Sequence, residues 1–113
     1  MSHTEPSNAV VRRRFGMFLW KKLQIVWPIL SVLALIQALL GVFAGFVEGW
    51  SFGDSLYFTF VTGLTIGYGD FVPKHFLSRL SAIAIALDGI VVMGLIAAVS
   101  VRALEETAKA QNE

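Results

Sequence analysis

Two long apolar stretches constrain this chain more than any other feature of its sequence. Residues 23–47 contain no charged side chain, and as a helix they would be roughly 37 Å long, enough to cross a hydrocarbon core of ~30 Å with some tilt. Residues 80–101 form a second stretch, interrupted only by Asp88, two serines and two glycines. Hydrophobic residues make up 56% of the chain, which is high for a water-soluble domain of this size. The sequence therefore predicts two membrane-spanning helices.

Basic residues are distributed unevenly around these stretches. Five of the nine Lys and Arg residues precede the first stretch, Arg102 and Lys109 follow the second, and only Lys74 and Arg79 lie between them. The positive-inside rule then predicts a cell-membrane protein with both termini in the cytoplasm. A cleaved signal peptide is the alternative for residues 23–47, but that run is about twice as long as a usual signal core.

The two ends of the chain are expected to be cytoplasmic segments. In residues 1–22, apolar side chains recur at helical spacing between Val10 and Lys22 beside a cationic face, as in an interfacial amphipathic helix on anionic headgroups. A cytoplasmic extension of the first membrane helix is the alternative, and the first eight residues are expected to be disordered. Residues 105–113 are too short for a ligand-sensing domain, so either gating lies within the membrane part or a regulatory domain is missing from this chain.

The overall composition excludes several other functions. A net charge of +1 gives no reason to expect nucleic acid as a partner. The chain has no cysteine, which excludes disulfides and thiolate metal sites. Both histidines lie far in sequence from a plausible nucleophile and acid, so we predict that the chain is not an enzyme.

The segment between the apolar stretches holds a predicted short helix. Ser51 can cap a helix start, and Asp54 three residues later suits the positive end of the helix dipole. A helix over residues 52–63 then has one broad apolar face that can pack on membrane helices. That face comprises Leu56, Tyr57, Phe60, Val61 and Leu64.

Residues 65–69 follow this helix as irregular backbone. Such backbone is tolerated at membrane depth only where protein buries it or where it lines an aqueous path. Gly67 and Gly69 can adopt positive φ, and alternating handedness would turn successive carbonyls to the same side. One chain cannot surround an ion, but four chains could present stacked squares of oxygens that replace the hydration shell of a cation.

The hexapeptide Thr65-Ile66-Gly67-Tyr68-Gly69-Asp70 resembles the selectivity filter of potassium channels. The resemblance covers residues 23–104 and is nearest to bacterial two-transmembrane channels, which are homotetramers. It implies an all-α membrane protein with an outer helix at about 23–47, a re-entrant pore helix at 52–63, a filter at 65–69 and an inner helix at about 77–104.

The same resemblance implies the roles of individual residues. The permeant ion, dehydrated K⁺, would be bound by backbone carbonyls and by the Thr65 hydroxyl. The carbonyls would be those of Thr65, Ile66, Gly67 and Tyr68. Gly69 would complete the outer mouth of the filter. Asp70 and Thr62 would support the filter from behind. The cavity and gate would be lined by Leu64, Ile90, Met93 and Ala97.

Three features depart from the family pattern. Many members have threonine where this chain has Leu64, and some bacterial members have a carboxylate where it has Val61. The family's response to cavity blockers and its inactivation behaviour therefore cannot be carried over to this chain. No arginine-rich voltage-sensing helix is present, so strong voltage dependence is not expected.

Residues of the inner helix leave alternatives open. Gly89 and Gly94 are each either a gating hinge or a close-packing position, with the hinge favoured at Gly89 and packing at Gly94. Asp88 near mid-membrane needs a partner or water. It could face the cavity, or it could form a buried hydrogen bond with Thr59 or Thr62, and its helical phase favours the buried role.

Two rival functions and one peripheral site complete the predictions. A weakly selective cation channel would share this architecture, and a two-helix membrane adaptor would use the intervening loop to bind a partner. At the external end, Glu48, Lys74 and His75 are expected to form a solvated rim, although they could modulate gating by pH.

Overall fold

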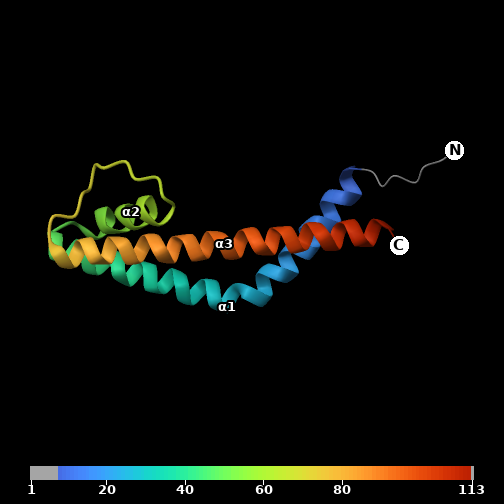
Figure 1. Cartoon of the computed structure of the whole chain (residues 1–113), viewed down its shortest axis with the longest axis horizontal. Coiled ribbons are helices and arrows are strands. Elements are labelled where there is room, and N and C mark those ends of the chain that lie inside the picture. The colour runs from blue at the N-terminus through green and yellow to red at the C-terminus, as the bar shows by residue number, and fades with distance from the viewer. Residues whose placement is uncertain (1–7, 113) are drawn as a thin grey trace. The chain divides into compact units, whose positions relative to one another are not determined.

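The computed structural model describes residues 8–112, and they form three helices. The helices are α1 (Asn8–Glu48), α2 (Phe52–Gly63) and α3 (Phe76–Asn112), and the described residues contain no strand (Figure 1). Two of them, α1 and α3, are long and apolar enough to cross a membrane. The predicted all-α class with two membrane-spanning helices is therefore confirmed. The expected disorder of the first eight residues concerns positions that, apart from Asn8, lie outside the described residues.

Helix α1 differs from the expectation of a separate interfacial helix before the outer helix. The basic segment and the uncharged stretch form one continuous helix from Asn8 to Glu48, which is the arrangement of the alternative interpretation. The reason is local, because the residues between 10 and 27 include no proline and only one glycine to interrupt the helix. Pro28 lies inside α1.

Helix α3 also exceeds its expected length. It continues beyond residue 104 to Asn112, through the segment that was expected to be a tail. After Gly94 the sequence has no glycine or proline and is rich in alanine, leucine and glutamate, which favour helix.

The chain divides into two compact units after Pro28 and after Gly94. In the first unit, the described residues are the N-terminal part of α1 and the C-terminal part of α3. Lys22 Nζ lies 2.7 Å from a Glu106 carboxylate oxygen, and the Arg14 guanidinium donates to the Ala110 carbonyl at 3.4 Å. These polar contacts join the two helical segments within that unit.

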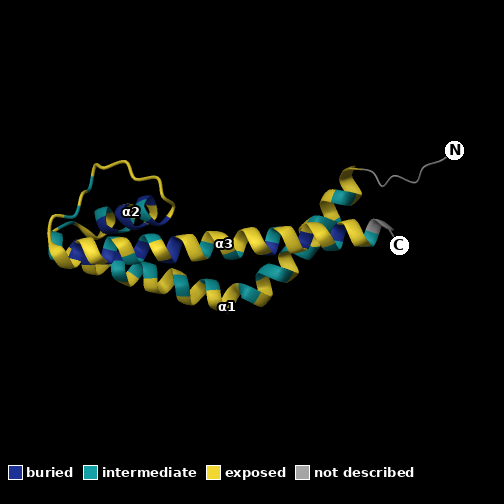
Figure 2. Cartoon of the chain, viewed as in Figure 1, coloured by how far each residue is buried: buried dark blue, intermediate teal, exposed yellow. Residues whose placement is uncertain are grey.

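The second unit, residues 29–94, packs α2 against parts of α1 and α3. Its core contains one side chain from each helix, namely Ala44, Phe58 and Ile85, and Figure 2 shows α2 as the helix richest in buried residues.

Two glycines one turn apart let α1 approach α2 closely. A Cβ at Gly41 would lie 1.6 Å from Thr59 Oγ1, and one at Gly45 would lie 1.7 Å from Ser55 Oγ. This small-xxx-small spacing is typical of helices that pack closely in membranes.

Candidate functional site

The start of α2 is fixed by the predicted cap. Ser51 Oγ accepts a hydrogen bond from the Asp54 N–H at 3.1 Å, which satisfies one of the donors that a helix start leaves free. The helix ends at Gly63, and the Leu64 N–H still donates to the Phe60 carbonyl at 2.9 Å. The segment that starts at Thr65 therefore follows directly after the C-terminal cap of α2.

Backbone hydrogen bonds hold the first part of segment 65–69 against α2. The N–H groups of Ile66 and Gly67 both donate to the Val61 carbonyl, at 2.9 and 3.2 Å, and the Thr65 N–H donates to the Thr62 carbonyl at 3.1 Å. No described peptide bond is cis, so each carbonyl points opposite to the N–H of its own peptide group. The carbonyls of Thr65 and Ile66 consequently point away from α2.

Alternate residues of the segment adopt left-handed backbone conformations. Positive φ occurs at Thr65 (60°), Gly67 (61°) and Gly69 (82°), and not at Ile66 or Tyr68. The two glycines were expected to do so, but Thr65 was not. A β-branched residue at positive φ is a strained outlier of the kind that clusters at functional sites. Its hydroxyl donates to the Leu64 carbonyl at 2.6 Å, which leaves the oxygen lone pairs available as acceptors.

One chain leaves this segment uncovered. Every residue from Thr65 to Asp70 is exposed, and Tyr68 is 69% exposed. Carbonyls that point away from the only helix supporting them have no partner within the segment itself. The arrangement suits oxygen donors that face a ligand or another copy of the chain.

Aromatic side chains hold the residues that follow the segment. Tyr57 on α2 forms a side-chain hydrogen bond with Asp70, and this bond raises the pKa of Tyr57 above its usual value. The ring of Phe71 packs edge-on against Trp50 and Tyr57, with centroids 5.4 and 5.9 Å apart. Asp70 therefore has the kind of contact expected of a supporting residue, and Tyr57 supplies it. The sequence reasoning assigned Tyr57 only to an apolar face, although its hydroxyl was a signal that a polar partner was needed.

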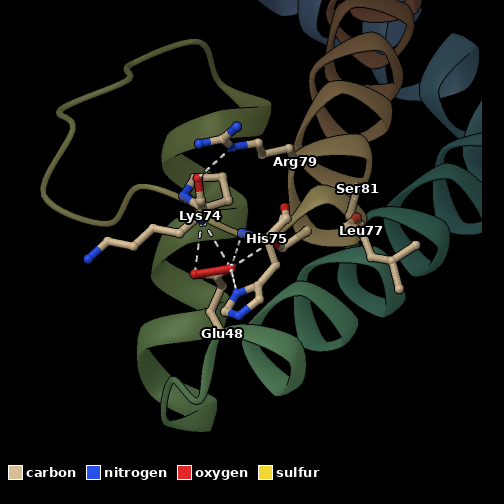
Figure 3. A network of polar contacts seen from close by, with 8 residues as sticks. Glu48, Lys74, His75, Leu77, Arg79 and Ser81 are labelled. Carbon is tan, nitrogen blue, oxygen red and sulfur yellow. Dashed lines mark hydrogen bonds and ion pairs between the residues drawn. The ribbon is translucent and has the colours of Figure 1, made fainter.

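Glu48, at the end of α1, organises a second polar centre (Figure 3). Its carboxylate accepts from the backbone N–H groups of Lys74 and His75, at 3.0 and 2.9 Å, and from the Ser78 hydroxyl at 2.6 Å. The His75 ring Nδ1 also lies 2.6 Å from it. Because Lys74 and His75 directly precede α3, Glu48 places a negative charge at the positive end of that helix.

The expectation that Glu48 belongs to a solvated rim is therefore wrong. Its side chain is only 4% exposed, whereas that of His75 is 61% exposed. Hydrogen bonds from the Ser78 hydroxyl, the His75 ring and the two backbone N–H groups outweigh the effect of burial and lower the pKa of Glu48 to about 2. Ser78 was missed because nothing in the sequence relates it to a residue thirty positions earlier.

Asp88 lies on the buried side of α3. It is 9% exposed in the isolated chain, so its carboxylate faces the packed interior and not the open side. Neither carboxylate oxygen has a hydrogen-bond partner among the described residues, and the Thr59 hydroxyl donates to the Ser55 carbonyl at 2.7 Å instead. The suggested hydrogen bond to Thr59 or Thr62 is thus absent.

The two inner-helix glycines have different surroundings. A Cβ at Gly89 would lie 2.0 Å from the Gly63 carbonyl oxygen, whereas a Cβ at Gly94 meets nothing within 4 Å. Gly89 therefore lets α3 pack directly on the end of α2, and no such contact requires glycine at position 94.

The four residues assigned to a cavity or gate share one property. All of them are exposed in the isolated chain, in contrast to Asp88 and Gly89 on α3. They are Leu64, Ile90, Met93 and Ala97.

The chain is similar in sequence to known ion channels. The model of a family described as "Ion channel" matches residues 29–106. The chain is 35% identical over 71 residues to potassium channel protein 1 of Methanocaldococcus jannaschii, covering 63% of this chain and 20% of that protein. It is 39% identical over 70 residues to probable potassium channel protein 2 of the same organism, covering 62% and 20%.

A human relative matches a shorter region. Potassium channel subfamily K member 16 is 47% identical over 43 residues, which cover 34% of this chain and 14% of that protein. The chain thus spans a fifth or less of the length of these three relatives. No solved structure gives a significant match.

Proposed function

Because the chain belongs to the ion channel family, whose members are channels and not enzymes, we propose that it forms a potassium-selective pore. Four copies would surround one conduction path, with residues 65–69 of each copy as the selectivity filter. The observation that carries the proposal is the backbone of this segment. Its first N–H groups bind the end of α2, so the carbonyls of Thr65 and Ile66 point away from α2.

The filter would act by replacing water with carbonyl oxygens. A cation in water is surrounded by oxygen dipoles, and rings of four carbonyls supply the same kind of ligand without covalent chemistry. Thr65 would add its hydroxyl oxygen at the inner end. Residues 65, 67 and 69 have positive φ and alternate with residues that do not. This alternation supports an arrangement in which successive filter carbonyls face the same side, toward the proposed conduction path.

Gating is assigned to the inner helix α3. Leu64, Ile90, Met93 and Ala97 would line the cavity and the gate, which accords with their exposure in a single copy. We place the hinge at Gly94, because Gly89 is held against the carbonyl of Gly63 whereas Gly94 has no neighbour within 4 Å. The chain also divides into its two units at this residue.

The proposed orientation places both termini in the cytoplasm of a cell-membrane protein, because the basic residues gather beside the outer ends of the two apolar stretches. The uncharged residues 23–47 offer no gating charges, so we propose that this chain itself contains no voltage sensor.

Reversal potentials of the purified chain in planar bilayers, with opposed sodium and potassium gradients, test the proposal. A reversal near the potassium equilibrium potential is expected. A reversal near zero would instead indicate a weakly selective cation pore. Absence of current from a folded tetramer would favour the two-helix adaptor.

Two glycine variants provide a matched comparison for the filter. Neither Gly67 nor Gly53 has a neighbour within 4 Å of an added Cβ, but only Gly67 has positive φ. Gly67→Ala therefore adds strain of about 1–2 kcal/mol per copy and should abolish potassium selectivity, while Gly53→Ala should retain it. Equal reversal potentials for the two variants would contradict the assignment of residues 65–69 as the filter.

A further inference from the structure

A glutamine side chain of α1 reaches another helix inside the uncharged stretch. Gln37 is half-buried and belongs to residues 23–47, where hydrocarbon offers an amide no hydrogen-bond partner. Its Nε2 donates to the Ile85 carbonyl oxygen of α3 at 3.3 Å. Glutamine side chains commonly join membrane helices by such bonds, so Gln37 ties the outer helix to the inner helix within the second unit.

The same amide lies against the end of α2. A Cβ at Gly63, the last residue of α2, would lie 2.2 Å from Gln37 Nε2 and 3.2 Å from its Oε1. On its other side, the Gly63 carbonyl oxygen would lie 2.0 Å from a Cβ at Gly89 of α3. All three helices therefore meet at Gly63, two residues before Thr65 begins the proposed filter.

The acceptor that Gln37 uses is not the one that most needs a donor. Within α3, the Ile85 carbonyl already accepts from the N–H group of Gly89 and points toward it along the helix axis. Asp88 lies beside Gly89 and is 9% exposed, and neither of its carboxylate oxygens has a hydrogen-bond partner among the described residues. A buried carboxylate without a donor costs far more free energy than a carbonyl that loses a second donor. Asp88 is therefore a second acceptor at the level of the amide.

Resting on the proposed pore function, we propose that Gln37 is a positioning residue for the filter, whose amide donates either to the Ile85 carbonyl or to the Asp88 carboxylate. Because this amide packs against Gly63, a change of acceptor changes the space left for the end of α2. The displacement reaches the filter, since the N–H groups of residues 65–67 donate to the last carbonyls of α2. Two acceptors for one amide thus give the filter two positions, which is a means of gating apart from the hinge at Gly94.

Hydrogen–deuterium exchange of the purified full chain in detergent, followed by mass spectrometry, tests this role without conduction. Gln37→Leu keeps nearly the same volume and removes the donor. Exchange at residues 65–67 should become about threefold faster, which is the usual effect of one interhelical hydrogen bond in a membrane protein. Gln24→Leu makes the same change at an exposed position of α1 and should leave exchange as in the wild type. Equal exchange in the two variants would overturn the role of Gln37.

An exchange of the two side chains tests the pairing with Asp88. Gln37→Glu places a second carboxylate beside Asp88 and should speed exchange at residues 65–67 and change the open probability by about threefold or more. Adding Asp88→Asn returns one amide and one carboxylate to the site, on opposite helices, and should restore both values. A loss of packing alone would not be rescued in this way.

Two results separate this inference from the proposed function. Potassium-selective current in the wild type without rescue by the double variant would overturn the pairing and leave the pore standing. Rescue of the exchange rate in a chain that carries no current would refute the pore and retain the pairing. Gel filtration and circular dichroism select folded variants, and if Gln37→Glu does not fold, Gln37→Leu against Gln24→Leu still decides the role of Gln37.

Discussion

Replacement of Gly89 by alanine tests how closely α3 approaches the end of α2. The added Cβ would lie 2.0 Å from the Gly63 carbonyl oxygen, 2.8 Å from its carbonyl carbon and 3.0 Å from its Cα. A tolerable carbon–oxygen contact is about 3.3 Å, so the helices must separate by about 1.3 Å. The atoms concerned are backbone atoms and cannot rotate away, so the overpacking should cost about 3 kcal/mol. Alanine recovers about 1 kcal/mol of helix propensity, which leaves a net loss of about 2 kcal/mol.

A loss of this size is measurable. It corresponds to about 30-fold in the folding equilibrium constant, and thermal unfolding in detergent should show a Tm lower by roughly 10 °C. Because Gly63 lies two residues before Thr65, the displacement should also reduce rubidium flux relative to sodium flux in liposomes.

Gly94→Ala is the matched control for this experiment. It adds the same methyl group to the same helix, where nothing lies within 4 Å, so its Tm should equal or exceed that of the wild type. If position 94 is the hinge, flux through Gly94→Ala changes without loss of stability. A Gly89→Ala protein with wild-type Tm and selectivity would refute the packing described for α2 and α3.

Three further substitutions address other parts of the site. Glu48→Gln should lower the Tm by several degrees, because a neutral amide is a weaker acceptor for the donors that precede α3. The network lowers the pKa of Glu48 from 4.5 to about 2, so the stabilisation by its carboxylate is complete above about pH 5 and is lost as the pH falls toward 2. The Tm difference between the wild type and Glu48→Gln should therefore shrink over that pH range. A constant difference would contradict the hydrogen-bond network around Glu48. Asp88→Asn should leave block by internal magnesium unchanged and should not lower the Tm, since it removes a charge from a buried position without a partner; weaker block would show that Asp88 reaches the cavity. Tyr57→Phe removes the hydroxyl that contacts Asp70 and should lower the ratio of rubidium to sodium flux, whereas an unchanged ratio would mean that Asp70 needs no such support.

Local sequence signals predicted the elements of this protein well. The membrane helices follow from uninterrupted apolar composition, which requires no knowledge of neighbours. The Ser51 cap and positive φ at Gly67 and Gly69 depend on residue types within a few positions of each other, and the structure contains all three. The family match over residues 29–106 confirms the resemblance to potassium channel pore domains that was drawn from the hexapeptide.

Backbone contacts of the filter could not be predicted in the same way. The sequence drew attention to Val61 only because some bacterial channels have a carboxylate at that position. In the structure, its backbone carbonyl accepts two hydrogen bonds from the filter. Because every residue type has a backbone carbonyl, the identity of residue 61 could not predict these bonds. Positive φ at Thr65 runs against the preference of a β-branched residue. Such a conformation persists only where surrounding structure imposes it.

By itself, the sequence determined that the chain enters a membrane, which two stretches span it and which six residues form the candidate filter, because composition and short motifs act locally. Only the tertiary structure decided that Glu48 binds the start of α3, that Gly89 meets Gly63, and that Asp88, for which the helical phase had already favoured burial, has no hydrogen-bond partner among the described residues. These pairs are separated by tens of residues, or depend on the rotation of one helix against another. Their contacts arise from packing, which no local pattern along this chain specifies.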